Sequence, residues 1–287
     1  MTGAGLYCTV SAGDRTVKGR KNMKKRTLVS VIIFTMLAAF LISGCGAERN
    51  TETYTGIISA MDNEVDLLLK ETDVKSVETI GGVEYHIGTL KGENVVIAKA
   101  GIGKVMSSAG ITAMLNNYNI SRVLFTGIAG GVGDETQVLD EVVATRLVQH
   151  DFGMTTDEGF KWYEGYEDFD KYFECDKDLV DLAYNAAVKV VGEVHVFKGT
   201  IATGDQFISS EQYVKRLQED FDALACEMEG ASIAMVCKQY ETPFVVIRAM
   251  SDKADGKAHD TYENMADIAA DNSSRIIIQM IEDSKKN

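Results

Sequence analysis

A short stretch near the C-terminal end of the chain holds residue types that could do chemistry on a small polar molecule. The residues are Glu227, Met228, Glu229, Arg248, Ser251 and Asp252. The glutamates precede a helix-like segment, and the arginine follows an apolar run at residues 244–247. Ligands of open α/β sheets bind where strands end and helices begin. Carboxylates and a guanidinium at such an edge predict a small-molecule site, although each residue alone also fits a capped helix beside a surface ion pair.

The pattern of apolar residues predicts alternating strands and helices around this site. Continuous or alternating apolar runs predict strands, and apolar residues at i, i+3 and i+4 predict helices. The expected strands cover residues 55–60, 83–90, 94–100, 122–126, 141–148, 194–202, 223–226 and 244–247. The expected helices cover residues 62–70, 105–118, 179–191, 209–217, 230–240 and 266–281. Such alternation favours an α/β fold with a central, mixed but mostly parallel sheet.

Two glycine-rich segments differ from the nucleotide-binding motifs that they partly match. Residues 101–105 have Ala98 where a phosphate loop has its first glycine, and Val105 where it has Ser or Thr. Residues 127–133 are followed by Thr136, where the dinucleotide motif has its last glycine. We therefore interpret both segments as tight turns from a strand to a helix, in which backbone N–H groups can approach a ligand.

Charge, cysteine and histidine content exclude several classes of function. The formal net charge of −14 disfavours binding to nucleic acid. The cysteines of the C-terminal half, Cys175, Cys226 and Cys237, have no CxxC spacing, and no two histidines have the spacing of metal ligands. We expect no metal, no other cofactor and no disulfide framework.

The N-terminal segment has the features of a bacterial lipoprotein signal. A positive region, an apolar run at residues 27–42 and two small residues precede Cys45; the charged and small residues are Lys24, Lys25, Arg26, Ser43 and Gly44. The apolar run is shorter than the roughly 20 residues that span a membrane. We expect translation to begin at Met23, residues 1–44 to be a leader and signal peptide, and Cys45 to be lipidated. Residues 45–53 would form a tether and residues 54–287 one folded domain, exported and held on the outer face of the cell membrane by its lipid alone.

Six short motifs occur in order along the chain. They are SAMDNEV at residues 59–65, AGIGKV at 100–105, TGIAGG at 126–131, TGDQFI at 203–208, EME at 227–229 and RAMSD at 248–252. Together they resemble the 5′-methylthioadenosine/S-adenosylhomocysteine nucleosidases of the purine nucleoside phosphorylase superfamily, over about residues 55–285. The resemblance implies a three-layer α/β/α fold, a homodimer, no metal, and irreversible hydrolysis of the bond between adenine and ribose.

The resemblance also implies roles for individual residues. Asp252 would give a proton to N7 of the leaving adenine, and burial against apolar neighbours can keep it protonated. Glu64 would orient and deprotonate the attacking water, with help from Arg248. Glu229 would accept hydrogen bonds from both ribose hydroxyls. The remaining binding residues are Phe207, which would stack on adenine, Ile208, whose backbone would read its edge, Met228, which would lie along the sugar, and Ser251.

One departure from the family pattern bears on the reaction. Ile128 stands where we expect a serine that touches the attacking water or, in phosphorylases, the phosphate. An apolar side chain is a poor neighbour for phosphate, which favours hydrolysis. Two alternatives stay open: a phosphorolytic enzyme of the same superfamily, and a nucleoside-binding lipoprotein that feeds a transporter. The aromatic-rich residues 149–166 are consistent with either a pocket for the 5′ substituent or a dimer contact.

Overall fold

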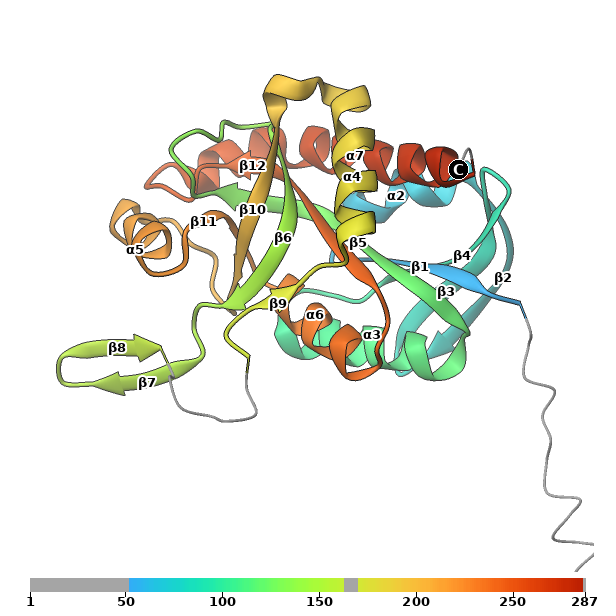
Figure 1. Ribbon diagram of the computed structural model, residues 1–287, viewed down its shortest axis with the longest axis horizontal. Coiled ribbons are helices and arrows are strands. Elements are labelled where there is room, and N and C mark those ends of the chain that lie inside the picture. Colours follow the sequence, from blue (N-terminus) through green and yellow to red (C-terminus); the bar gives the residue numbers. More distant parts are fainter. Residues whose placement is uncertain (1–51, 163–169, 286–287) are drawn as a thin grey trace, which may run out of the picture. The chain divides into compact units, whose positions relative to one another are not determined.

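A ten-stranded mixed sheet forms the centre of the computed structural model, which describes residues 52–162 and 170–285 (Figure 1). The expected lipoprotein signal and residues 163–166 lie outside these ranges. The strands are β1 (Tyr54–Ser59), β2 (Thr72–Ile80), β3 (Val83–Leu90), β4 (Glu93–Lys99), β5 (Ile120–Gly131), β6 (Glu141–Gln149), β9 (Phe173–Glu174), β10 (Val196–Thr203), β11 (Ala223–Glu227) and β12 (Phe244–Asp252). A separate hairpin, β7 (Gly153–Thr156) and β8 (Gly159–Trp162), projects from the body.

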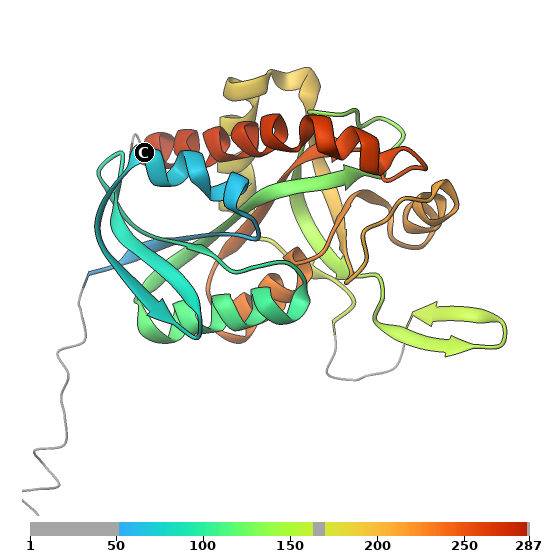
Figure 2. The same cartoon turned by 180° about the vertical axis from the view of Figure 1, so that it is seen from behind.

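Helices cover both sides of the sheet, as the sequence predicts (Figures 1 and 2). One group contains α2 (Asp62–Glu71), α4 (Lys177–Val191) and α7 (Ala258–Ser284), in which α2 and α4 each pack against α7. The other contains α3 (Lys104–Asn117) and α6 (Gly230–Gln239), while α5 (Glu211–Phe221) packs on β10 and β11. No helix in the described part of the chain is both long enough and apolar enough to cross a membrane.

The strand order is β11-β10-β6-β12-β5-β1-β4-β3-β2, with β9 beside β6. Parallel pairs join β4, β1, β5 and β12, and a second parallel set joins β6, β10 and β11. Every residue of β12 is buried, as is typical of a strand covered on both faces. Because this strand carries Arg248 and Asp252, its polar side chains must find partners inside the protein.

The two glycine-rich segments behave differently in the structure. Gly101 and Gly103, with φ of +94° and +91°, form the predicted turn between β4 and α3. The turn predicted at residues 127–133 is wrong, because β5 continues to Gly131. The glycines serve close packing here: a Cβ at Gly127 would lie 2.0 Å from Arg248 Nη1.

Strand β2 was absent from the prediction for a physical reason. Its sequence, TDVKSVETI, is largely polar, and most of its residues are exposed. It pairs with β3 alone at the edge of the sheet. Because neither of its faces is buried, its sequence need not alternate between apolar and polar residues.

An additional pairing closes one half of the sheet and shapes the site. Besides its parallel pairing with β10, β11 pairs with β5 in the antiparallel sense, at Ala225↔Gly131 and Cys226↔Gly130. Asp252 of β12 lies opposite the same Gly130. The ends of three strands therefore meet around Gly130.

Candidate active site

A cavity of about 330 Å³ opens where these strand ends meet. Its lining includes four carboxylates, one from the first turn of α2 and three from the predicted C-terminal stretch, together with apolar and aromatic side chains. The lining residues that the argument uses are Glu64, Phe207, Ile208, Met228, Glu229 and Asp252. Within residues 52–162 and 170–285, no Lys or Arg lines this cavity. Over the same ranges, no cluster of His, Cys, Asp and Glu could hold a metal ion.

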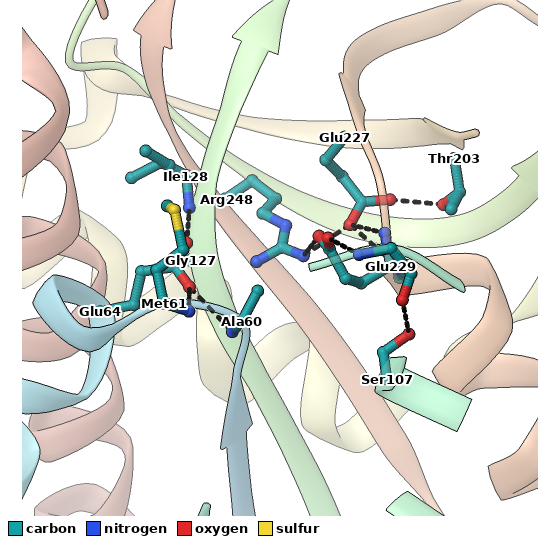
Figure 3. A network of polar contacts seen from close by, with 12 residues as sticks. Ala60, Met61, Glu64, Ser107, Gly127, Ile128, Thr203, Glu227, Glu229 and Arg248 are labelled. Carbon is teal, nitrogen blue, oxygen red and sulfur yellow. Dashed lines mark hydrogen bonds and ion pairs between the residues drawn. The ribbon is translucent and has the colours of Figure 1, made fainter. Parts of the chain in front are cut away.

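Glu64 lies in the first turn of α2 with its carboxylate bound by backbone donors (Figure 3). Oε2 accepts hydrogen bonds from the N–H groups of Ala60 and Met61, each at 2.9 Å, and Oε1 accepts one from Ile128, also at 2.9 Å. Burial raises the pKa of Glu64, although the charge of Arg248 and the three backbone donors act in the opposite direction. A raised pKa makes the carboxylate of Glu64 a stronger proton acceptor, which suits it to act as a base.

Arg248 lies between Glu64 and a pair of glutamates and is fully buried (Figure 3). Its Nη2 donates to Glu227 Oε2 at 2.5 Å and lies 3.5 Å from Glu229 Oε2, and its guanidinium lies 4.0 Å from the centre of the Phe125 ring. Because the side chain has no exposed surface, it does not contact the cavity, which corrects the expectation that it binds substrate or water directly. It acts on Glu64 through its charge.

Gly127 allows this arrangement. A Cβ at this position would come within 2.5 Å of Glu64 Oε1 as well as colliding with Arg248 Nη1. The carboxylate and the guanidinium therefore both close over the same backbone position of β5. Any side chain there would separate the base from its neighbouring cation.

Glu227 is a site residue to which the sequence analysis gave no role. Its carboxylate accepts hydrogen bonds from the N–H groups of Glu229 (3.0 Å) and Gly230 (2.7 Å), from Arg248, and from the hydroxyl of Thr203. It therefore fixes both the start of α6 and the guanidinium. The sequence signal for this role was the first glutamate of the EME motif, because a buried guanidinium such as that of Arg248 needs anionic partners.

Glu229 faces the cavity from the residue before α6. Its Oε1 accepts the N–H of Gly103 at 2.7 Å. Burial and the charge of Glu227 raise the pKa of Glu229 to about 7, against the opposing effects of Arg248 and the Gly103 donor. Donors such as the two hydroxyls of a ribose would favour its ionised form.

Asp252 ends β12 and has few but well-formed contacts. Oδ1 accepts the N–H of Ala254 at 2.7 Å, and Oδ2 accepts the hydroxyl of Ser251 at 2.9 Å. Burial raises the pKa of Asp252, and these hydrogen bonds lower it in part. Ser251 lines the cavity, but its hydroxyl is directed to Asp252 and, at 3.3 Å, to the carbonyl of Ala129. It is thus a partner of the acid as well as a wall of the cavity.

The other predicted binding residues also line the cavity. Phe207 is 53% exposed and meets Tyr262 edge to face, with ring centres 5.9 Å apart. Ile208 is buried and Met228 is half-buried. Ile128 is buried, and its side chain belongs to an apolar cluster with alanines of α7. The side chain at this position therefore has no hydroxyl group, in contrast to the serine expected there.

Other lining residues were not assigned by the sequence analysis. They are Cys226, His259 and Tyr262. The latter two follow Asp252 in the chain, on the first turns of α7, and only the folded chain brings them to the cavity. None of the described residues of the aromatic-rich stretch 149–162 lines it.

The chain is similar to known nucleosidases over most of its length. A family model described as the phosphorylase superfamily matches residues 54–282. A 5′-methylthioadenosine/S-adenosylhomocysteine nucleosidase of Bacillus thuringiensis (strain Al Hakam) is 36% identical over 231 residues, which cover 80% of this chain and 98% of that protein. The nucleosidase of the same name from Bacillus anthracis (strain A0248) shows the same values.

Solved structures agree with this relationship. A 5′-methylthioadenosine/S-adenosylhomocysteine nucleosidase from Neisseria meningitidis, in complex with methylthio-immucillin-A, superposes with a TM-score of 0.74 at 33% identity, covering 80% of this chain and 99% of that one. A futalosine hydrolase of Helicobacter pylori gives a TM-score of 0.74 at 30% identity, covering 80% and 98%. With this fold, this cavity and relatives of this similarity, the chain belongs to the phosphorylase superfamily, within the group of the 5′-methylthioadenosine/S-adenosylhomocysteine nucleosidases.

Proposed function

We propose that the protein hydrolyses the N-glycosidic bond of 5′-methylthioadenosine, S-adenosylhomocysteine or 5′-deoxyadenosine, and releases adenine and a 5-substituted ribose. The observation that supports this most directly is one cavity lined by two buried carboxylates of raised pKa, Glu64 and Asp252, beside a third carboxylate, Glu229. Groups whose protonation is shifted toward neutral pH are suited to acid–base work.

Each of the three carboxylates has a different role in the reaction. Breaking the bond moves electrons into the purine and leaves positive charge on the ribose. Asp252, whose pKa is raised by burial, donates a proton to N7 of the base. Glu64 takes a proton from water as it attacks C1′. Glu229 accepts the ribose hydroxyls and adds negative charge beside the cationic sugar.

The charge of the cavity favours water over phosphate as the nucleophile. Four carboxylates line it, and the buried Arg248 is already paired with Glu227 and Glu229. A phosphate dianion entering there would meet like charges without a free cation. The apolar side chain of Ile128 adds no donor.

The first experiment follows adenine release from methylthioadenosine by the purified protein in phosphate-free buffer. Futalosine is added to the substrate panel because one structural relative is a futalosine hydrolase. We expect release at a rate that added phosphate does not change. Release that requires phosphate would identify a phosphorylase, and tight binding without release would identify a receptor for a transporter. A receptor has no use for Glu64 and Asp252 together, which makes this outcome the least expected.

We further propose that the protein is a homodimer. The turn before α3 and the first turn of this helix carry the exposed apolar side chains of Ile102, Val105 and Met106. Ile102 also lines the cavity, so a second copy covering this patch would shield the mouth of the site from water. Sedimentation of the purified protein should give twice the chain mass, and Val105→Asp should give the single mass. A wild-type protein of single mass contradicts the proposal.

We also propose that the protein is exported and anchored by a lipid on Cys45. The support is the order of the positive residues, the apolar run and the small residues before this cysteine. Radiolabelled palmitate should enter the wild-type chain in bacterial cells, and the chain should sediment with membranes. Cys45→Ala should abolish both. Equal labelling of the variant would rule out lipidation at this residue.

A further inference from the structure

We propose that Lys104, Asp151 and Asp205 form a positioning cluster that fixes the adenine-stacking segment relative to the ribose-binding carboxylate. This proposal rests on the proposed function, because it concerns the same cavity. None of the three residues lines the cavity, so they act through the residues beside them.

The cluster joins three segments that are distant in sequence. Asp151 follows β6, Asp205 follows β10, and Lys104 is the first residue of α3. The Lys104 Nζ donates to Asp151 Oδ1 at 2.6 Å, and the Lys104 backbone N–H donates to Asp205 Oδ1 at 2.8 Å. The Asp205 N–H donates to Asp151 Oδ2 at 2.9 Å and closes the ring. Because each residue binds the other two, the three segments hold a single relative position.

The cluster sets the position of the segment that carries Phe207. This side chain, which would stack on adenine, comes two residues after Asp205 and is more than half exposed. The Phe207 ring meets the ring of Tyr262 edge to face. Side-chain packing alone therefore holds the ring weakly, and its placement depends on the backbone at Asp205.

The same cluster is linked to Glu229, the proposed ribose-binding carboxylate, through the adjacent residues Gly103 and Lys104. The N–H of Gly103 donates to Glu229 Oε1, and the next N–H, that of Lys104, donates to Asp205 Oδ1. Two consecutive donors at the start of α3, where the helix dipole favours anions, thus bind Glu229, which lines the cavity, and Asp205, which lies outside the lining. The geometry is tight, since a Cβ on Gly103 would lie 3.0 Å from Asp205 Oδ1. Movement of Asp205 would disturb the distance between the adenine and ribose contacts.

The test compares Asp205→Ala with Asp205→Asn in the full chain. Alanine removes the acceptor for the Lys104 N–H, and we expect the KM for methylthioadenosine to rise about fivefold, the equivalent of one hydrogen bond, with kcat nearly unchanged. Asparagine keeps an oxygen at this position and should restore most of the affinity. Glu71→Gln, which breaks the surface ion pair with Lys91 (2.7 Å), is the matched control and should change neither constant.

A second comparison separates positioning from general stability. If Asp205 acts by placing Phe207, then Asp205→Ala should add little to the KM of Phe207→Ala. Additive effects, a loss of kcat without a change in KM, or an asparagine variant no better than alanine would overturn the proposal. Calorimetric binding of adenine provides the same comparison without turnover. If the wild-type protein released no adenine, the proposed function would fail, while adenine binding would still decide the role of the cluster.

Discussion

Replacement of Glu64 by glutamine is expected to lower kcat for adenine release by about 10³-fold, within the range typical of a lost general base, with little change in KM. Glutamine has nearly the same shape but cannot take a proton from water at neutral pH. It also carries one acceptor oxygen where the native carboxylate serves three N–H groups. If this oxygen faces Ala60 and Met61, the Ile128 N–H meets an NH₂ group. We therefore expect a loss of about 1–3 kcal/mol in the free energy of unfolding.

Steady-state kinetics and thermal unfolding of the same preparations measure both effects. Asp62→Asn is the matched control, because Asp62 is an exposed acid in the same first helical turn, paired with Lys99 on the surface. If Glu64 only stabilised the helix dipole, the two variants would lose similar activity. A Glu64→Gln protein that keeps more than a tenth of the wild-type kcat would contradict its role as the base.

Replacement of Asp252 by asparagine is expected to lower kcat by about 10³-fold and to leave stability unchanged, in contrast to the Glu64 variant. The amide oxygen can accept the Ala254 N–H, and the NH₂ group can donate to the Ser251 hydroxyl, so both native contacts survive. The variant can still donate a hydrogen bond to adenine but cannot transfer a proton. Binding should persist while bond cleavage stops.

Calorimetry with methylthioadenosine, together with single-turnover adenine release, separates binding from cleavage in this variant. Asp255→Asn is the control, because this nearby acid is half-buried and lies outside the cavity lining. Unimpaired cleavage by Asp252→Asn would move the acid to another residue. Loss of binding equal to the loss of kcat would make Asp252 a binding residue only.

The dependence of kcat/KM on pH should be bell-shaped. The direction of each limb follows from the titration of Glu64 and Asp252, whose pKa values are both raised. As pH falls through the pKa of Glu64, the base becomes protonated and activity is lost. As pH rises through the pKa of Asp252, the acid ionises and activity is lost again. Ser251→Ala removes a hydrogen bond that lowers the pKa of Asp252, so the alkaline limb should move to higher pH. An unmoved limb would assign that titration to another group.

The carboxylates of the site were predicted from six ordered motifs that resemble those of the nucleosidases, and each also lies at the end or the start of a predicted element. Glu64 follows the first strand by a few residues, and Asp252 closes an apolar run. Their convergence on one cavity follows from the order of parallel strands, whose ends meet at one edge of the sheet. The alternation of elements likewise predicted the layers and the mixed central sheet, although the polar edge strand β2 gave no signal.

The partners of Arg248 could not be predicted, because they depend on contacts distant in sequence. Its position on β12 places it opposite Gly127 of β5, and the end of β11 brings Glu227 to its side. The same long-range pairing explains why residues 127–131 continue a strand although their glycines are typical of a turn. A local pattern gives the residue type, whereas strand register determines which side chains meet.

The close approach over Gly127 limits how this sequence can change over generations. Glu64, Gly127 and Arg248 come from three separate parts of the chain, yet a single added methyl group at the middle position would collide with both of the others. A substitution at Gly127 would therefore be tolerated only if Glu64 and Arg248 changed as well. In a mutational scan, Gly127 should therefore tolerate substitution as poorly as the catalytic base Glu64, although it has no side chain to contact a substrate.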